Sequence, residues 1–244
     1  MKRILVLSDN LYLVEKFIAI YLSKGFSRNQ ITIAFSPQGS PLKEIKTFEG
    51  LIPVSLNVKV EFAKIIKNYD LVFSIHSKQV FPSELVQKVK CINIHPGLNP
   101  YNRGWYPQVF SILNKMPLGA TIHEMDEELD HGAIICQKEV LVYGWDTSLS
   151  AYERVQQAEI ELLQEWLPQL ISGDYKTYKP QKEGNVNLKK DFNALCQLDL
   201  QQQQSVGGTI DLLRALSHGD YSNAFFIDSS TGKKVWVSIS LNEE

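Results

Sequence analysis

The sequence predicts an α/β protein built on a doubly wound, mostly parallel sheet, followed by a small helix and β-hairpin. Short apolar runs alternate with segments of helical periodicity through the first half of the chain, which is typical of βαβ units. The runs are apolar on both faces, as expected for parallel strands that helices cover on each side. Polar residues follow several of these strands directly, where open α/β sheets place their sites. Together these observations favour a Rossmann-like architecture.

The first half of the chain supplies the parallel strands and their connecting helices. Apolar runs predict strands over residues 3–7, 30–34, 70–75 and 91–94. Helical spacing of apolar residues predicts helices over 11–21, 58–68 and 82–90, the first closed by Lys24–Gly25. The order of these segments is that of a parallel sheet with crossover helices.

The second half is expected to extend the sheet and then to change character. A helix is predicted over 104–115, a pair of strands over 118–125 and 133–142, and a long helix over 149–172. Thr147 or Ser148 can cap the long helix, and Gly173 ends it. The composition turns polar after Pro180, which predicts a catalytic domain over 1–180 and a small region over 181–244.

The sequence of the C-terminal region predicts one helix and a β-hairpin. Thr209 is expected to cap a helix over 210–218. Strands over 223–228 and 233–241 flank a turn at 229–232. Because a two-stranded ribbon is marginal alone, its apolar face should pack on the main domain or on another subunit.

Composition excludes several classes of function. The 244 residues are 44% hydrophobic and 21% charged, with a net charge of −2, so a nucleic-acid partner, which favours a basic domain, is not expected. The three cysteines show no CxxC spacing and predict neither a disulfide framework nor a zinc site. The short apolar run at the N-terminus does not resemble a secretory signal, and no run is long enough to span a bilayer. We therefore expect a cytoplasmic protein.

The turn after the first strand reads Ser8-Asp9-Asn10-Leu11 and lacks a Gly-x-Gly-x-x-Gly sequence. A dinucleotide fingerprint needs those glycines for the tight turn and for close approach to the pyrophosphate. A dehydrogenase is therefore disfavoured, although the architecture is Rossmann-like.

The strongest chemical signal is Asn93-Ile-His95 at the end of a predicted strand. Side chains of a strand alternate between faces, so Asn93 and His95 should point to the same side of the sheet. The Pro- and Gly-rich segment that follows requires a shaped loop. Downstream, Asp130-His131-Gly132 lies between two predicted strands. This arrangement can bring the Asp130 carboxylate over the Asn93/His95 pair.

These three elements resemble the formyltransferase family that uses 10-formyltetrahydrofolate. The family shares an Asn-x-His at a strand end, a loop with Pro and Arg-Gly, and a Leu-Asp-x-Gly sequence, which Leu129 to Gly132 match here. The resemblance covers residues 1–180 and implies the formyltransferase fold. The tail, through 189–192, 211–216 and 232–236, looks like that of sugar-nucleotide N-formyltransferases. The loop departs from the commonest family form, with Pro-Gly-Leu-Asn after His95.

The resemblance implies formyl transfer from N10-formyltetrahydrofolate to a dTDP-linked amino-dideoxy sugar, dTDP-4-amino-4,6-dideoxyglucose being favoured, for O-antigen or surface-polysaccharide synthesis. The residue types fit that chemistry independently. His95 suits general base work because imidazole titrates near neutral pH. Asn93 can donate to the developing oxyanion, and Asp130 can orient and stabilise the imidazolium. No metal is required. Catalytic roles are therefore expected for Asn93, His95 and Asp130.

Binding residues are assigned more by position than by chemistry. Candidate sugar-nucleotide contacts are Asn10, His76, Lys78, Gln79, Arg103, Trp105 and Tyr106. Candidate folate contacts are Phe81, Asp126, Glu127, Glu128 and Leu129. Lys78 fits either a pyrophosphate contact or a solvated surface lysine. His76 could contact a ligand, or it could be a strand-end histidine whose hydrogen bonds are all made within the protein. Trp105 and Tyr106 could line a sugar pocket or belong to the core.

The sequence is also compatible with other acceptors and with other classes of function. His123 and His131 are expected to be solvent-exposed bystanders. The acceptor could instead be a UDP-amino sugar, glycinamide ribonucleotide or initiator tRNA, and water as acceptor would make the protein a 10-formyltetrahydrofolate hydrolase. A non-catalytic sugar-nucleotide binder would have no need of a base. The resemblance and the apolar hairpin together imply a homodimer.

Overall fold

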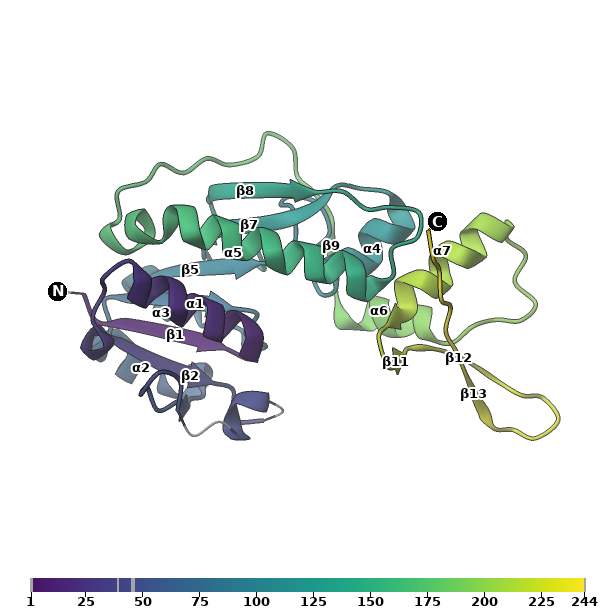
Figure 1. Ribbon diagram of the computed structural model, residues 1–244, viewed down its shortest axis with the longest axis horizontal. Helices are drawn as coiled ribbons and strands as arrows, with labels where there is room; N and C mark the ends of the chain where they lie inside the picture. The colour runs from purple at the N-terminus through teal and green to yellow at the C-terminus, as the bar shows by residue number, and fades with distance from the viewer. Residues whose placement is uncertain (1, 39, 45–46, 244) are drawn as a thin grey trace.

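The computed structural model describes residues 2–38, 40–44 and 47–243, and it has the predicted α/β architecture (Figure 1). The strands of its main sheet are β1 (Ile4–Ser8), β2 (Ile31–Phe35), β3 (Val54–Ser55), β4 (Leu71–Ile75), β5 (Lys90–His95), β7 (Leu118–Glu124) and β8 (Ile134–Val140). Within the described residues, neighbouring strands of this sheet follow the order β3-β2-β1-β4-β5-β7-β8. The strands from β3 to β5 are parallel neighbours, whereas β7 and β8 are antiparallel additions. The predicted doubly wound, mostly parallel sheet is confirmed.

Helices cover both faces of this sheet. The α-helices are α1 (Leu11–Ser23), α2 (Val58–Asn68), α3 (Ser83–Lys88), α4 (Pro107–Asn114), α5 (Ser148–Ser172), α6 (Lys189–Cys196) and α7 (Val206–Leu216), with 3-10 turns at Arg28–Gln30 and Pro41–Glu44. Helices α1 and α5 lie on one face, and α2 and α3 on the other (Figure 1). In β1, Ile4 and Val6 join the core under α1 and α5, while Leu5 and Leu7 join the core under α2 and α3. This alternation explains why the strand is apolar throughout.

The helix ends show why these segments form where they do. The Asn10 side chain accepts a hydrogen bond from the Leu13 N–H and caps α1. Thr147 and Ser150 form a capping box at the start of α5. The α5 helix ends at Gly173, whose φ of +88° is a left-handed conformation that glycine adopts without strain. The sequence predicted the caps of α5 correctly.

The helix predicted from Gly104 begins instead at Pro107. Gly104 has φ +92° and Tyr106 has φ +54°, and neither value is compatible with a right-handed helix. Residues Arg103–Gly104 form the short strand β6, which pairs in parallel with β9 (Val186–Asn187). The loop after β5 is therefore held by a segment more than 80 residues away in the chain.

The C-terminal region also differs from the prediction. The helix predicted over 210–218 with Thr209 as its cap begins at Val206, because the Ser205 side chain caps it four residues earlier than expected. Helix α6 was not predicted. The predicted hairpin exists as β12 (Ala224–Ile227) and β13 (Lys234–Val237), but its strands are shorter than expected. A second small pair, β10 (Ser217–His218) and β11 (Tyr221–Ser222), precedes it.

The hairpin leaves large apolar side chains exposed, with Trp236 at 55% and Ile227 at 44%. Among the residues that the structure describes, no helix is both long enough and apolar enough to cross a membrane.

Candidate active site

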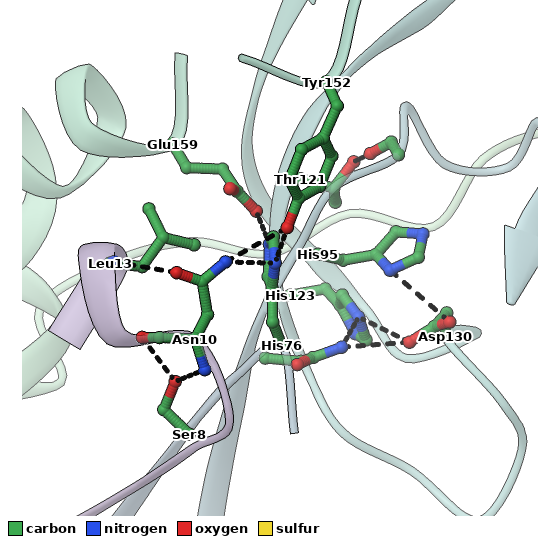
Figure 2. Close-up of polar contacts among 12 residues, drawn as sticks. Ser8, Asn10, Leu13, His76, His95, Thr121, His123, Asp130, Tyr152 and Glu159 are labelled. Carbon is green, nitrogen blue, oxygen red and sulfur yellow. Dashed lines mark hydrogen bonds and ion pairs between the residues drawn. The ribbon is translucent and has the colours of Figure 1, made fainter. Parts of the chain in front are cut away.

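The carboxyl end of β5 carries Asn93 and His95, and two other segments approach it. Strand β7 runs antiparallel to β5 and places His123 directly opposite Asn93. The loop after β7 then turns back and brings Asp130 to the same place. Figure 2 shows His95, His123 and Asp130 converging from these separate elements. The structure therefore brings the three predicted catalytic side chains together with a further histidine.

Asp130 is the centre of this polar cluster. Its Oδ1 accepts a hydrogen bond of 2.9 Å from Asn93 Nδ2. Its Oδ2 lies 3.5 Å from His95 Nδ1 and accepts a bond of 3.1 Å from the Gly104 N–H. Each carboxylate oxygen thus has its own partners, so the carboxylate is fixed in orientation as well as in position.

The proton on His123 can be assigned from its partners. His123 Nδ1 lies 2.8 Å from the carbonyl oxygen of Glu124, which can only accept, so Nδ1 carries the proton. In the neutral ring Nε2 is then an acceptor, 3.3 Å from Asn93 Nδ2. His123 therefore helps to orient the Asn93 amide.

The protonation states of His95 and Asp130 suit an acid–base pair. Burial lowers the pKa of His95 to about 4, against the opposing attraction of Asp130. For Asp130, burial acts to raise the pKa, but attraction by His95, the neighbouring His123 ring and the bond from the Gly104 N–H outweigh it and lower the pKa to about 2. At neutral pH the pair is a neutral imidazole beside a carboxylate. His95 Nε2 is buried and has no hydrogen-bond partner among the described residues.

Three backbone positions make this geometry possible. A Cβ on Gly97 would lie 2.5 Å from His95 Nε2, so a side chain there would fill the space at the imidazole. A Cβ on Gly132 would lie 1.7 Å from the carbonyl oxygen of Glu124, so only glycine allows the Asp130 loop to approach β7 so closely. Asp130 itself has φ +50°, and its carbonyl oxygen accepts a 2.7 Å bond from Asn99 Nδ2.

A second polar cluster lies at the end of the neighbouring strand β4. His76 Nε2 lies 2.7 Å from Glu159 Oε1, and its Nδ1 lies 2.8 Å from the Tyr152 hydroxyl. Asn10 Nδ2 donates to the same hydroxyl at 3.1 Å. Glu159 and Tyr152 both project from α5, and Figure 2 shows this cluster beside the first. Both ring nitrogens of His76 are therefore in use.

A cavity of about 650 Å³ opens over both clusters. This volume lies within the range typical of small-molecule sites. Of the predicted site residues, those that line it are Asn93, His95, Asp130, His76, Lys78, Gln79, Trp105, Tyr106, Phe81, Asp126, Glu127, Glu128 and Leu129. The cavity floor thus joins the expected catalytic residues to most of the expected binding residues.

The structure places three predicted binding residues differently from the expectation. Asn10 is the α1 cap and binds Tyr152, behind the cavity lining. Gln79 lines the cavity, but its amide is used by the Val58 N–H and the Leu56 carbonyl. Arg103 is buried and faces a separate cavity of about 40 Å³, where Glu183 lies 3.5 Å away. Asn10 and Arg103 thus lie outside the lining of the large cavity, whereas Gln79 lines it with its amide already engaged.

The expectation that His123 and His131 are solvent-exposed bystanders is wrong. His123 is 1% exposed and lies within the Asp130 cluster. His131 is partly buried and pairs with Asp126 at 2.9 Å, which raises its pKa. The antiparallel return of β7 causes the first error, because it places His123 against Asn93.

Several cavity residues were not predicted. Tyr152 and Ser148 come from the start of α5, and Phe192, His218, Tyr221 and Asn223 come from the C-terminal region. Phe192 packs on Tyr106 with a ring-centroid distance of 4.2 Å. The sequence offered one signal for Tyr152 and Glu159, since residues seven apart lie on the same helix face. It offered none for the C-terminal residues.

A doubly wound sheet with an amide and a neutral imidazole at the end of one strand, and a carboxylate brought to them by an adjacent loop under a cavity, is suited to an enzyme of the acyl-transfer type. Comparison with known proteins gives the family. The profile described as "Formyl transferase" matches residues 52–167, and one described as "N-formyltransferase dimerization C-terminal domain" matches residues 191–243. The chain is 48% identical over 188 residues to a dTDP-4-amino-4,6-dideoxyglucose formyltransferase of Mycobacterium bovis, covering 77% of this chain and 80% of the relative.

Solved structures agree with this assignment. A sugar N-formyltransferase from Shewanella sp FDAARGOS_354 superposes with a TM-score of 0.93 at 45% identity, covering 100% of this chain and 99% of that one. A 4-N formyltransferase from Francisella tularensis superposes with a TM-score of 0.91 at 42% identity, with the same coverage. The chain belongs to the formyl transferase family, and it is an N-formyltransferase.

Proposed function

We propose that this enzyme transfers the formyl group of N10-formyltetrahydrofolate to the 4-amino group of dTDP-4-amino-4,6-dideoxyglucose. The observation that carries the reaction is the buried Nε2 of His95, unpartnered among the described residues, beneath the cavity and beside Asn93 and Asp130. The acceptor is taken from the Mycobacterium bovis relative, whose name specifies that sugar nucleotide, and from the 4-N specificity in the description of the Francisella tularensis structure.

The side chains of the cluster divide the chemistry between them. As the sugar amine attacks the formyl carbon, it must lose a proton, and neutral His95 accepts that proton at Nε2. Asp130, 3.5 Å from Nδ1, stabilises the imidazolium that results. Asn93 Nδ2 keeps its 2.9 Å bond to Asp130 and turns its other hydrogen, which lies towards His123 Nε2 at 3.3 Å, to the oxyanion that develops on the formyl oxygen. The bond from formyl carbon to N10 then breaks, N10 takes up the proton that His95 accepted from the amine, and tetrahydrofolate leaves while His95 returns to its neutral form.

The cavity walls suggest where each substrate lies. Phe81 is nearly buried and, with Met125, offers an apolar surface to a pterin ring, and the loop of Asp126 to Leu129 offers backbone and carboxylate groups to its polar edge. Lys78 is an exposed cavity residue whose backbone N–H donates to Asp9. We assign its ammonium group to the pyrophosphate of the sugar nucleotide. Trp105 and Tyr106 then border the sugar.

We further propose a homodimer, a cytoplasmic location and a role in surface-polysaccharide synthesis, O-antigen included. The dimer is supported by the description of the matched C-terminal profile and by the exposed apolar side chains of the hairpin, Trp236 and Ile227 among them. The location and role are supported by the proposed substrates, which are water-soluble metabolites of the cell interior. Among the described residues, no group of His, Cys, Asp and Glu is arranged to hold a metal ion.

The test is consumption of N10-formyltetrahydrofolate by the purified protein with separate acceptors. These are dTDP-4-amino-4,6-dideoxyglucose, its 3-amino isomer, a UDP-linked 4-amino sugar, glycinamide ribonucleotide, initiator methionyl-tRNA and water alone. Turnover with the first sugar, lost in the His95→Ala variant, is expected. Turnover only with another acceptor would overturn the choice of sugar, and turnover with water alone would identify a hydrolase.

A further inference from the structure

The loop after β5 carries the backbone group that orients Asp130, but the loop is held from a distant part of the chain. The Gly104 N–H donates to Asp130 Oδ2 at 3.1 Å. On either side of Gly104, the Arg103 N–H donates to the Asn185 carbonyl at 3.0 Å, and the Trp105 N–H donates to the Asn187 carbonyl at 2.9 Å. We call residues 183–187 the strap. Figure 1 shows the chain crossing from the end of α5 over the β8 side of the sheet before it reaches β9 in this strap.

The side chain of Asn102 gathers the strap and the loop into one network. Its Nδ2 donates to Ser111 Oγ at 3.0 Å and to Asn114 Oδ1 at 3.2 Å. Its Oδ1 accepts from the side-chain amides of Asn114, Asn185 and Asn187 at 2.7, 2.7 and 3.2 Å. Asn102 is 0% exposed and has φ +49°. Both amide hydrogens and the carbonyl oxygen are thus in use, and a buried network with every member satisfied is rigid.

The strap and the loop after β5 pack so closely that there is no room for a Cβ between their backbones. A Cβ on Gly104 would lie 2.4 Å from the Asn187 carbonyl oxygen, and a Cβ on Gly184 would lie 1.7 Å from the Pro100 carbonyl oxygen. The two backbones are therefore in direct contact on both sides of Asn102. A displacement of the strap must displace Gly104, and with it the N–H that binds Asp130.

We propose that Asn102, acting with Asn185 and Asn187 of the strap, is a positioning residue that fixes Asp130 against His95 through the Gly104 N–H. The proposal rests on the proposed function of His95 and Asp130 in formyl transfer. None of these asparagines lines the large cavity, so their effect on the reaction is indirect. The segment that follows the predicted domain boundary is on this view a working part of the catalytic site.

The test compares Asn102→Gly and Asn187→Ala with the control Val186→Ala. Glycine adopts the left-handed backbone of position 102 without strain, so that variant removes the side chain and its hydrogen bonds without forcing the loop out of shape. Val186 lies between the two strap asparagines, is 41% exposed, and points to the opposite side of the short strand. We expect kcat for formylation of the amino sugar to fall roughly 10- to 100-fold in Asn102→Gly and Asn187→Ala. The reason is that misplacing a reacting group by about 1 Å can lower the rate about 100-fold. KM values should change much less, and Val186→Ala should match the parent.

A double-mutant cycle with Asp130→Asn separates positioning from general structural damage. If the strap acts through Asp130, then Asn187→Ala should have little further effect on kcat in the Asp130→Asn background. The same fold-loss in both backgrounds would overturn the proposal, and so would an unchanged kcat in a folded Asn187→Ala protein.

Hydrogen exchange at the Gly104 amide gives a readout that needs no substrate. Faster exchange in Asn187→Ala than in Val186→Ala is expected, and equal protection in the two variants would overturn the inference. If the parent enzyme formylates none of the sugar nucleotides, the proposed function fails, and the exchange measurement alone then decides on the strap.

Discussion

Two histidine–carboxylate pairs stand at the ends of neighbouring strands, and they differ in one respect that decides what each can do. At the end of β4, His76 uses both ring nitrogens, for Glu159 and for Tyr152. At the end of β5, His95 approaches Asp130 with Nδ1 and keeps Nε2 unpaired within the described residues. Both rings border the same cavity. A base needs an available nitrogen at the reacting atom, so of these two pairs the β5 pair is the one suited to the proton transfer that we propose.

A buried histidine beside a carboxylate is therefore not by itself evidence of catalysis. The surroundings distinguish the two pairs. Gly97 leaves space at His95 Nε2, whereas α5 fills the corresponding space around His76 with Tyr152 and Glu159. The β4 pair is suited to holding α5 against the sheet and to shaping the cavity wall.

The largest expected effect is that of His95→Gln on turnover. Loss of a general base typically lowers the rate by about 10²- to 10⁴-fold, and we expect kcat to fall by that factor with the fold retained. The matched variant His76→Gln should lower kcat far less. Steady-state formylation kinetics on both variants check this, and a greater loss of kcat in His76→Gln would reverse the comparison.

The next largest loss of kcat is expected for Asn93→Ala. Removing one oxyanion donor costs about 10²- to 10³-fold in comparable sites, and kcat should fall while KM for the donor changes little. The loss also deprives Asp130 Oδ1 of its 2.9 Å partner. Full activity in a folded Asn93→Ala protein would remove Asn93 from the proposed mechanism.

For the β4 pair, the large effect should be on stability. Glu159→Ala removes a carboxylate that is 0% exposed and leaves His76 Nε2 without its partner. Breaking one side of a buried pair typically costs about 3–5 kcal/mol. Urea unfolding should show a loss of this order, while Glu165→Ala, at an exposed position of the same helix, should be nearly neutral. Equal stabilities of the two variants would show that the buried pair contributes little.

The pH dependence of stability should report the state of His95. Because burial lowers its pKa from 6.5 to about 4, the unfolded chain binds more protons than the folded protein between these values. Stability therefore falls as pH drops from 6.5 towards 4, by up to about 3 kcal/mol for this group. The carboxylate of Asp130, with its pKa lowered to about 2, keeps its stabilising contribution until pH falls below 3.8. Unfolding curves at pH 7 and pH 5 should differ less for His95→Gln than for the parent.

The smallest expected effect is that of Tyr152→Phe. The change removes one hydroxyl that bridges Asn10 and His76, and a hydrogen bond of this kind contributes about 1 kcal/mol. A modest drop in the midpoint of thermal unfolding, with kcat within a few-fold of the parent, is expected. A large loss of turnover would mean that the β4 cluster takes part in the chemistry.

The sequence predicted the sheet well because its strands are short, apolar and separated by clear helix signals. The end of β5 with Asn93 and His95 followed directly from that pattern, and Asp130 from a loop between two predicted strands. His123 was misjudged because pairing between β5 and β7 is a contact between segments about 30 residues apart. Helix α4 was placed three residues too early because Gly104 and Tyr106 take left-handed conformations that local propensity does not reveal.

By itself, the sequence determined the α/β class, the order of the strands and helices, the long capped α5 and the Asn-x-His at a strand end. These follow from periodicity, capping and strand alternation, which act over a few residues. Only the tertiary structure decided which histidine keeps a nitrogen available, that Glu159 and Tyr152 occupy His76, and that Asn185 and Asn187 hold the catalytic loop. These depend on contacts between residues 76 to 85 positions apart, and no local pattern of residues records such contacts.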